Sequence, residues 1–151
     1  MHDLVAMLVS TVLGTLVGFE RQMGRKPAGL RTHTLVCLGS TMFVLVTNHA
    51  VLDLGGPHVN LSLDPTRMIH GVITGVGFLG AGSILRTEGY VHGLTTAASV
   101  WMVAAVGVAV GVHAYALAIT GTVLALIVLE GFRWVERFLA HGGDENGAGG
   151  S

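Results

Sequence analysis

Apolar residues run along this chain in five long stretches that short polar segments separate. The stretches are Leu4 to Phe19, Thr34 to Leu52, Met68 to Leu85, Gly93 to Val112 and Ala114 to Phe132. An α-helix needs about 20 mostly apolar residues to cross a bilayer, and inside the hydrocarbon it satisfies its own backbone polar groups. Charge, glycine, proline or histidine bounds each stretch. The pattern therefore predicts an all-α integral membrane protein with five transmembrane helices, the first of them short.

Composition supports a membrane environment and excludes some partners. Hydrophobic residues make up 51% of the 151 positions and charged residues 11%. A water-soluble globule of this size could not hide so much apolar surface, so the lipid bilayer is the expected solvent. The net charge of -1, with eight scattered Lys and Arg, argues against a nucleic-acid partner, which needs a concentrated basic face. The single cysteine, Cys37, provides neither a disulfide framework nor a cysteine-based metal site.

The basic residues predict how the helices are oriented in the membrane. Seven of them fall on one side of the predicted topology: Arg21, Arg25, Lys26, Arg31, Arg86, Arg133 and Arg137. Only Arg67 falls on the other side. Loops rich in Lys and Arg stay in the cytoplasm, so we expect the N-terminus outside and the C-terminus inside. We expect residues 1–138 to form the transmembrane domain and residues 139–151, which lack apolar content, to form a flexible tail.

An internal repeat is a second feature of the sequence. An offset of 64 residues aligns Gly18 with Gly82, Gly29-Leu30 with Gly93-Leu94, Thr32 with Thr96, Val36 with Val100, and His49-Ala50 with His113-Ala114. The matches predict a parallel repeat in which helices one and two correspond to helices three and four, with helix five added. Chance agreement in an apolar chain rich in Gly, Val and Ala is the alternative.

Glycines are concentrated in the third stretch, at Gly71, Gly75, Gly77, Gly80 and Gly82. The letters of 75–80 fit a dinucleotide-binding fingerprint, but that motif needs a strand before it and cannot lie within a membrane span. Small residues let helices approach closely in lipid, so we expect helix three to be central in the bundle or in a dimer. Gly14-x-x-x-Gly18 and Gly107-x-x-x-Gly111 indicate close packing of helices one and four. Helix breaks that expose carbonyls to an ion are the alternative for helix three.

Polar residues gather at the predicted cytoplasmic ends of the helices. The candidate ion or substrate site consists of Glu20, Arg21, Arg25, Arg31, Thr32, Thr95, Thr96 and Ser99. Polar groups at membrane depth are costly, so such a cluster suggests binding or gating. A purely structural alternative is that Glu20 pairs with Arg25 or Arg31, and that the hydroxyls cap a helix or bond back to the preceding turn.

The remaining polar residues suggest no catalytic or metal centre. His49 and His70 lie near the opposite membrane face without a His-x-x-x-His spacing, so we expect interfacial anchors. Glu130 is expected to reach the headgroups or to pair with Arg133. No nucleophile and base pattern or phosphate-binding loop is present in the sequence, so we expect neither an enzyme nor a bound cofactor.

Four ordered motifs carry a resemblance to a known family. They are Gly18-Phe-Glu-Arg-Gln22, Ala28-Gly-Leu-Arg-Thr32, Gly75-Val-Gly-Phe-Leu-Gly-Ala-Gly82, and Gly93-Leu-Thr-Thr-Ala-Ala98 followed by Trp101. With them, nearly the whole chain resembles the membrane domain of the MgtC/SapB family. The resemblance implies a bacterial inner-membrane protein with five spans that acts in magnesium homeostasis or in growth at low magnesium.

The chain departs from the MgtC pattern at two positions and in its length. Thr95 stands where that pattern has asparagine, and Met102 stands where it has cysteine. Only a short segment follows Phe138. The chain is therefore more similar to a SapB-like member that consists of the transmembrane domain alone.

Two functional hypotheses follow, and they belong to different classes. The first is an ion transporter, with Mg²⁺ as ligand or substrate; Mg²⁺ takes oxygen ligands, so carboxylates should line its path, and only Glu20 and Glu130 lie at depth on the inner side. The second is a regulator or assembly module that acts on another membrane protein, such as the F-type ATP synthase that the resemblance suggests. The second hypothesis predicts a homo-oligomer and tolerance of the loss of Glu20.

Overall fold

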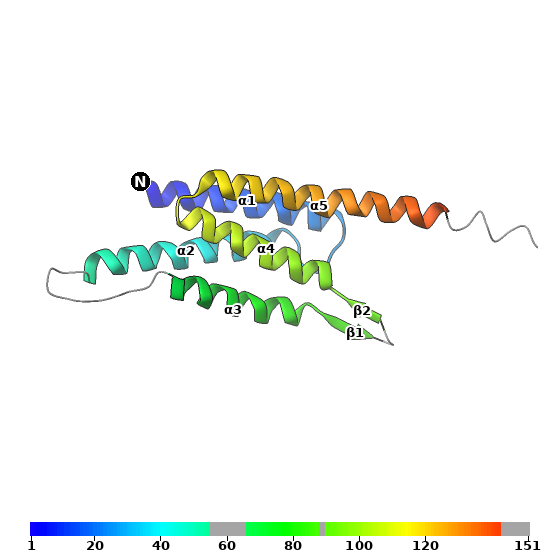
Figure 1. Ribbon diagram of the computed structural model, residues 1–151, viewed down its shortest axis with the longest axis horizontal. Helices are drawn as coiled ribbons and strands as arrows, with labels where there is room; N and C mark the ends of the chain where they lie inside the picture. The colour runs from blue at the N-terminus through cyan, green and yellow to red at the C-terminus, as the bar shows by residue number, and fades with distance from the viewer. Residues whose placement is uncertain (55–65, 88–89, 143–151) are drawn as a thin grey trace, which may run out of the picture.

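The computed structural model describes residues 1–54, 66–87 and 90–142, and this part of the chain forms five helices and one short hairpin (Figure 1). The elements are α1 (His2–Met23), α2 (Leu30–Leu54), α3 (Thr66–Gly82), β1 (Leu85–Thr87), β2 (Tyr90–His92), α4 (Leu94–Gly111) and α5 (Tyr115–Gly142). Four helices contain a segment long and apolar enough to cross a membrane: His2–Met23, Leu30–Ala50, Leu94–Gly111 and Tyr115–Arg133. The fifth, α3, has 17 residues. The predicted all-α membrane fold is confirmed.

Helix ends differ from the prediction where polar residues continue a helix. The first helix is not short: it has 22 residues and runs past Phe19 to Met23. Arg21 in its last turn is buried rather than solvated at the helix end. The last helix reaches Gly142 and so includes residues 139–142 of the predicted tail, while residues 143–151 lie outside the described part. The division into a domain and a tail stays a prediction.

A β-hairpin joins α3 to α4, where the sequence predicted a longer third helix. Helix α3 ends at Gly82, and Leu85, predicted to be helical, begins strand β1. The strands pair antiparallel, with Leu85 opposite His92 and Arg86 opposite Val91. Gly93 then starts α4 with φ of 89° and lies against the backbone of Ser83, so close that a side chain at position 93 would collide with the Ser83 carbonyl. Only glycine fits both this backbone conformation and this approach.

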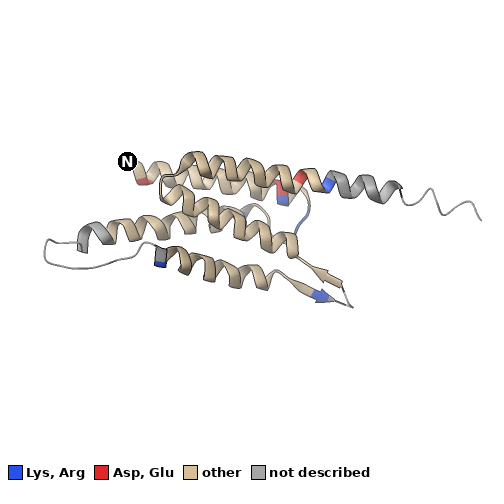
Figure 2. Cartoon of the chain, in the orientation of Figure 1, with Lys and Arg blue, Asp and Glu red and all other residues tan. Residues whose placement is uncertain are grey.

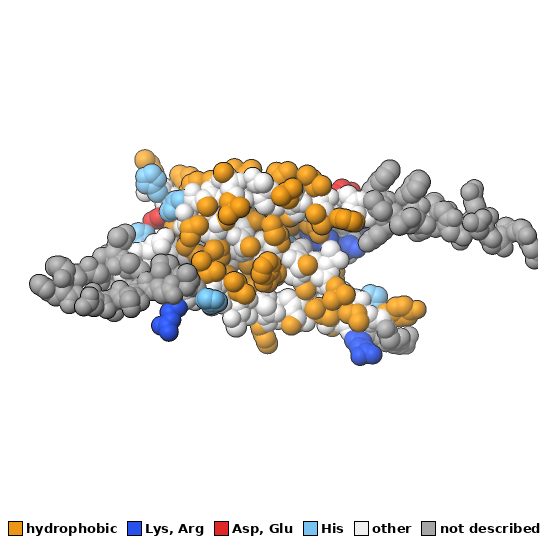
Figure 3. Space-filling model, in the orientation of Figure 1, with side chains coloured by type: hydrophobic (Ala, Val, Ile, Leu, Met, Phe, Trp, Pro, Cys, Tyr) orange, Lys and Arg blue, Asp and Glu red, His pale blue; other side chains and the backbone are white. Residues whose placement is uncertain are grey.

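Helix α4 is the centre of the bundle. It contacts α1, α2, α3 and α5, and ten of its eighteen residues are buried. Its sequence contains no charged residue and is apolar on all sides, as expected of a helix surrounded by others. Hydrophobic side chains also cover the outer surface of the other helices (Figure 3). This surface suits hydrocarbon as the surrounding medium.

The two hairpins are arranged as the repeat predicts. Helix α1 runs antiparallel to α2, and α3 leads through the β-hairpin to α4. Helices α2 and α4 lie side by side and run parallel, because contacts between them advance together along both chains: His33 with Ser99, Thr41 with Gly107, and Val44 with Gly111. Helix α1 also touches α4, and α3 also touches α2. The bundle therefore has the order of a parallel two-helix repeat with α5 added.

Glycines bring α1 and α4 against α2. A Cβ atom at Gly14 would lie 2.7 Å from the Cβ of Cys37, and one at Gly18 would lie 2.7 Å from the Cα of Leu30. On α4, a Cβ at Gly111 would lie 2.6 Å from the Cβ of Val44, and one at Gly107 would collide with the Cys37 carbonyl oxygen. The Gly-x-x-x-Gly motifs of helices one and four thus act as predicted, by letting backbones touch.

The glycine-rich helix α3 lies at the edge of the bundle instead of its centre. A Cβ at Gly71, Gly75, Gly77 or Gly82 would meet no atom within 4 Å, whereas one at Gly80 would lie 3.6 to 3.8 Å from Ala97. Within the chain, α3 reaches α4 mainly through valines such as Val72 and Val76. The prediction that helix three is the central helix of the bundle is wrong, because α4 has that position. A central position in a dimer stays a prediction.

Candidate functional site

Charged residues concentrate where α1 and α3 end and α2 and α4 begin (Figure 2). We call this side the basic end; its described residues are Glu20, Arg21, Arg25, Lys26, Arg31, Arg86, Glu130 and Arg133. Helix α5 passes alongside α1 there and adds Glu130 and Arg133. Two parts of the chain separated by more than 100 residues thus contribute to one charged cluster.

Glu20 is the most buried carboxylate whose side chain the structure describes. Its side chain is 10% exposed, against 42% for Asp3 and 56% for Glu130. One carboxylate oxygen lies 3.7 Å from Nη1 of Arg21, and the other lies 3.4 Å from Nη1 of Arg133. The predicted pairing with Arg25 or Arg31 is wrong: the partners of Glu20 are Arg21 and Arg133, while Arg25 and Arg31 are exposed.

Arg21 is buried on the inner face of α1. Its side chain is 3% exposed, and it belongs to the same helix face as Gly14 and Gly18. Within the part of the chain that the structure describes, Nε and Nη2 of Arg21 have no hydrogen-bond acceptor. These two nitrogens form the edge of the guanidinium group that can hold a carboxylate or phosphate with two parallel hydrogen bonds. A buried cation of this kind depends on its counter-charge, here Glu20.

Arg133 joins the two carboxylates of the cluster. Its Nη2 donates to the carboxylate of Glu130 at 2.6 Å, while its Nη1 donates to Glu20 at 3.4 Å. The predicted pairing of Glu130 with Arg133 is confirmed. Because Arg133 lies on α5 and Glu20 on α1, this guanidinium group ties the last helix to the first at the basic end.

A buried histidine next to the charged cluster was missed by the sequence analysis. His33 on α2 is 0% exposed. Its Nδ1 lies 2.9 Å from the Gly29 carbonyl oxygen, and its Nε2 lies 3.0 Å from Oγ of Ser99 on α4. The Ser99 hydroxyl also lies 2.9 Å from the Thr96 carbonyl oxygen. In a neutral imidazole Nδ1 donates to Gly29, so Nε2 accepts, and the single hydroxyl hydrogen of Ser99 is shared between Nε2 and Thr96.

We expect Ser99→Ala to destabilise the bundle, because it leaves Nε2 of His33 buried without a partner. A buried polar atom that loses its partner costs about 1 to 3 kcal/mol. Thr95→Ala is the matched control, since Thr95 lies one turn away on the same helix with an exposed side chain. Thermal unfolding in detergent micelles, followed by circular dichroism, measures both variants. Equal midpoints for the two variants would contradict a stabilising role of the His33 to Ser99 bond.

The eight predicted site residues separate into two groups. Arg25, Arg31, Thr32 and Thr95 are exposed. Glu20, Arg21, Thr96 and Ser99 face the interior, and His33 and Arg133 join them. Thr95 is thus separated from Thr96 and Ser99, which are buried. The signal for His33 was available: it is four residues before Cys37 on the face of α2 that also carries the buried Ser40 and Thr41.

The opposite end of the bundle carries several histidines. His49 lies 2.8 Å from Asp3, joining the end of α2 to the start of α1, and both side chains are largely exposed. His113 packs edge to face on Tyr115 where α4 turns into α5. Among the described residues, no group of three or more His, Cys, Asp or Glu could hold a metal ion. Among the described carboxylates, Glu20 and Glu130 both pair with Arg133, so a cation would have to compete with this guanidinium group for either of them.

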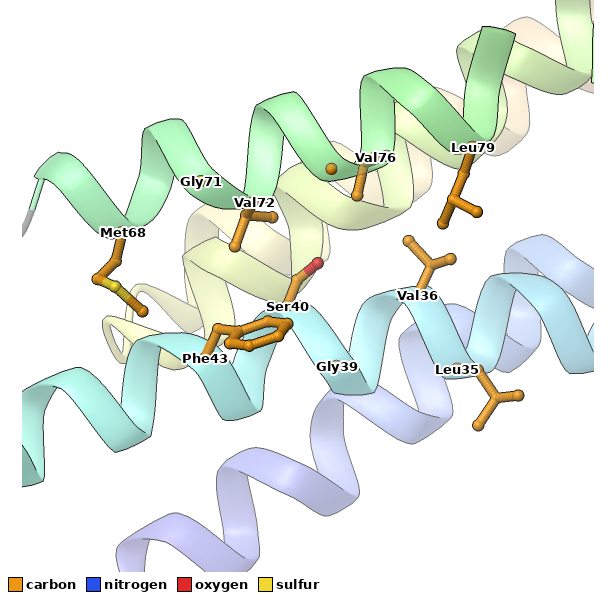
Figure 4. Close-up of a pocket in the computed structure, with 11 residues that line it drawn as sticks. Leu35, Val36, Gly39, Ser40, Phe43, Met68, Gly71, Val72, Val76 and Leu79 are labelled. Carbon is orange, nitrogen blue, oxygen red and sulfur yellow. The ribbon is translucent and has the colours of Figure 1, made fainter. Parts of the chain in front are cut away.

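An apolar groove opens between α2 and α3 (Figure 4). It has a volume of about 610 Å³. Its lining residues are Leu35, Val36, Gly39, Ser40, Phe43, Met68, Gly71, Val72, Gly75, Val76 and Leu79. The groove lies within the membrane-spanning part of the bundle and is separate from the charged cluster.

The fold and the cluster define a class: a five-helix integral membrane protein with a buried ion-pair cluster at one end of its bundle. Comparison with known proteins gives the family. The model of the MgtC family matches residues 7–138, so the chain belongs to the MgtC family. The expected MgtC/SapB resemblance is confirmed.

Three relatives illustrate the similarity. "Putative magnesium transporter YhiD" of Escherichia coli (strain K12) is 44% identical over 130 residues, covering 85% of this chain and 60% of YhiD. Protein SapB of Bacillus subtilis (strain 168) is 35% identical, covering 89% of this chain and 58% of SapB. Protein MgtC of Brucella abortus (strain 2308) is 39% identical, covering 84% of this chain and 50% of MgtC. The chain thus spans about half to three fifths of the length of these relatives. No solved structure matches it.

Proposed function

We propose that this chain is a bacterial inner-membrane protein that acts in magnesium homeostasis as a regulator of another membrane protein. In this proposal the basic end faces the cytoplasm, in keeping with the excess of Lys and Arg there. Membership of the MgtC family and the name of YhiD support the connection with magnesium. The proposal assigns the chain no chemical reaction and no cofactor.

One observation favours regulation over ion conduction: the most buried described carboxylate, Glu20, is held between two arginines. Mg²⁺ keeps several of its waters and binds through oxygen ligands, so a conducting path needs carboxylates that the ion can reach. At the basic end a cation would have to displace Arg21 and Arg133 from Glu20 and pass beside a buried guanidinium group. Charge repulsion opposes both steps. The cluster is better suited to holding α1 and α5 together than to passing a cation.

Flux and growth measurements together test the proposal. Liposomes that contain the purified protein and an internal Mg²⁺ dye are expected to take up Mg²⁺ no faster than empty liposomes. The same protein is expected to restore growth at low magnesium to a bacterium that lacks its own family member. Failure to restore growth would overturn the role in magnesium homeostasis, and Mg²⁺ uptake above that of empty liposomes would overturn the regulatory mechanism.

Magnesium transport is the second candidate, favoured by the name of YhiD and by the carboxylate at membrane depth. It predicts uptake that depends on Glu20. The informative variant is the double substitution Glu20→Gln with Arg21→Met, which removes a carboxylate together with its buried counter-charge and so keeps the interior electrically neutral. Transport requires this variant to lose uptake while remaining folded.

A further inference from the structure

Helix α5 packs at a position in the bundle that has an equivalent in the other half of the internal repeat. It packs against α1 and α4, with Ala118 and Thr122 each 1% exposed. Ala118 belongs to the same apolar core as Val17 of α1 and Val103 of α4. Exchanging the two halves of the repeat carries α1 to α3 and α4 to α2. The equivalent of the α5 position therefore lies against α3 and α2.

The groove between α2 and α3 occupies that equivalent position. Gly39 of its wall is 64 positions before Val103, and 64 is the repeat offset. Gly39 on α2 therefore corresponds to Val103 on α4, which shares an apolar core with Ala118 of α5. Helix α5 covers α1 and α4, whereas the corresponding side chains of α2 and α3 remain open: Phe43 is 58% exposed and Leu79 is 55% exposed. Figure 4 shows Phe43, Met68 and Leu79 around the groove and the Ser40 hydroxyl pointing into it. The bundle thus has two equivalent positions for a helix, and the chain fills one of them with its own α5.

The walls of the groove suit a helix. The motif Gly71-x-x-x-Gly75 lies along α3, and Gly39 lies opposite on α2. The corresponding motifs of α1 and α4 each pack against a helix within the chain, whereas Cβ atoms at Gly39, Gly71 and Gly75 would meet nothing within 4 Å. Small residues gain dispersion contacts in lipid only when another backbone approaches them closely. An acyl chain fills a groove without needing glycine at three places along it.

We propose that this groove is a dimer interface, in which α3 of a second copy of the chain lies against α2 and α3 of the first. Helix α3 is both a wall of the groove and an exposed apolar helix, so the same surface serves both partners. A two-fold axis along the membrane normal makes such a surface self-complementary and keeps both copies in the same orientation. In the dimer, Gly71 and Gly75 of the two copies face each other across the axis. The interface is independent of whether magnesium passes through the chain.

Native mass spectrometry of the full chain, released from mild detergent, tests the interface. The wild type is expected to be a dimer, and Gly75→Leu is expected to be a monomer because leucine fills the space that the partner backbone needs. Gly77→Leu is the matched control: it adds the same side chain two residues further on α3, outside the groove, and should remain a dimer. Both positions are open in the single chain, so both variants should keep the helicity of the wild type. A wild type that is monomeric with bound lipid, or a Gly75→Leu variant that stays dimeric, would overturn the proposal.

Disulfide trapping in native membranes provides a second measurement. Gly75→Cys is expected to form an oxidised species of twice the chain mass, because the two positions face each other across the axis. The wild type controls for Cys37, which is buried, and Leu8→Cys places an exposed thiol on α1, away from the groove. Cross-linking of Leu8→Cys at the same rate as Gly75→Cys would indicate random collision and contradict the interface.

Discussion

Gly107→Ala is expected to lower the thermal unfolding midpoint of the protein in detergent micelles by roughly 6 to 12 °C. The added methyl group would collide with the carbonyl oxygen of Cys37 and would lie 2.9 Å from the Cβ of Ser40. Neither atom belongs to the flexible end of a side chain, so α4 must move away from α2. Overpacking a tight core costs about 1 to 3 kcal/mol, and 3 kcal/mol corresponds to a shift of this size in a chain of this length.

Gly77→Ala is the matched control for Gly107→Ala. It makes the same chemical change within a helix, but the new Cβ meets no atom within 4 Å. Alanine favours a helix over glycine by about 1 kcal/mol, so this variant should be as stable as the wild type or slightly more stable. Circular dichroism during heating measures both variants. If both lower the midpoint equally, backbone contact between α2 and α4 at Gly107 does not limit stability.

The glycines show how far sequence reasoning reaches in this fold. The motifs at Gly14 and Gly107 predicted close packing, and the structure places each against α2. The same reasoning placed the glycine-rich helix at the centre, although α3 lies at the edge. Spacing shows that a helix has a small-residue face, but it does not show whether that face packs within the chain or outside it. The groove along α3 is what distinguishes the two cases.

The charged cluster shows a different limit of sequence reasoning. The sequence identified Glu20, Arg21 and Ser99 as candidates because polar groups are costly at membrane depth. Pairing was then assigned to neighbours in the chain, whereas the second partner of Glu20 is Arg133, 113 residues away on α5. Which helices are neighbours in space is set by packing of the whole bundle. Hydropathy and charge predict the spans, but they do not predict which spans touch.

The β-hairpin was missed for a local reason. Ile84 and Leu85 follow the apolar residues of α3 with only Ser83 between, so hydropathy extended the third helix to Leu85. The structure ends α3 at Gly82, three residues earlier. The alternation of Arg86 with Leu85 and Thr87 was too short a signal for a strand, because strands are recognised over four to eight alternating residues. The positive φ of Gly93 fixes the start of α4, and the only sign of this conformation in the sequence is the glycine itself.

Glu20→Gln is expected to destabilise the protein more than loss of both charges together. The ion pairs of Glu20 with Arg21 and Arg133 therefore replace the earlier expectation that a regulator tolerates the loss of Glu20. The substitution leaves Arg21, whose side chain is 3% exposed, without its counter-charge. Removing one member of a buried ion pair costs about 3 to 5 kcal/mol, because a charge stays behind in a medium of low polarity. Adding Arg21→Met removes that charge and leaves an unbranched apolar side chain in place of the aliphatic part of arginine, so the double variant should recover a large part of the loss.

Unfolding midpoints of the wild type, the single variants and the double variant form the thermodynamic cycle that tests this coupling. Glu130→Gln is the control, since Glu130 also pairs with an arginine but its side chain is 56% exposed. Exposed ion pairs contribute about 0 to 1 kcal/mol, so this variant should unfold close to the wild type. A double variant as unstable as the sum of its single variants would show that Glu20 and Arg21 act independently. Glu20 would then be stabilised mainly through Arg133 of α5, and the cluster would hold the last helix in place without depending on the buried guanidinium group.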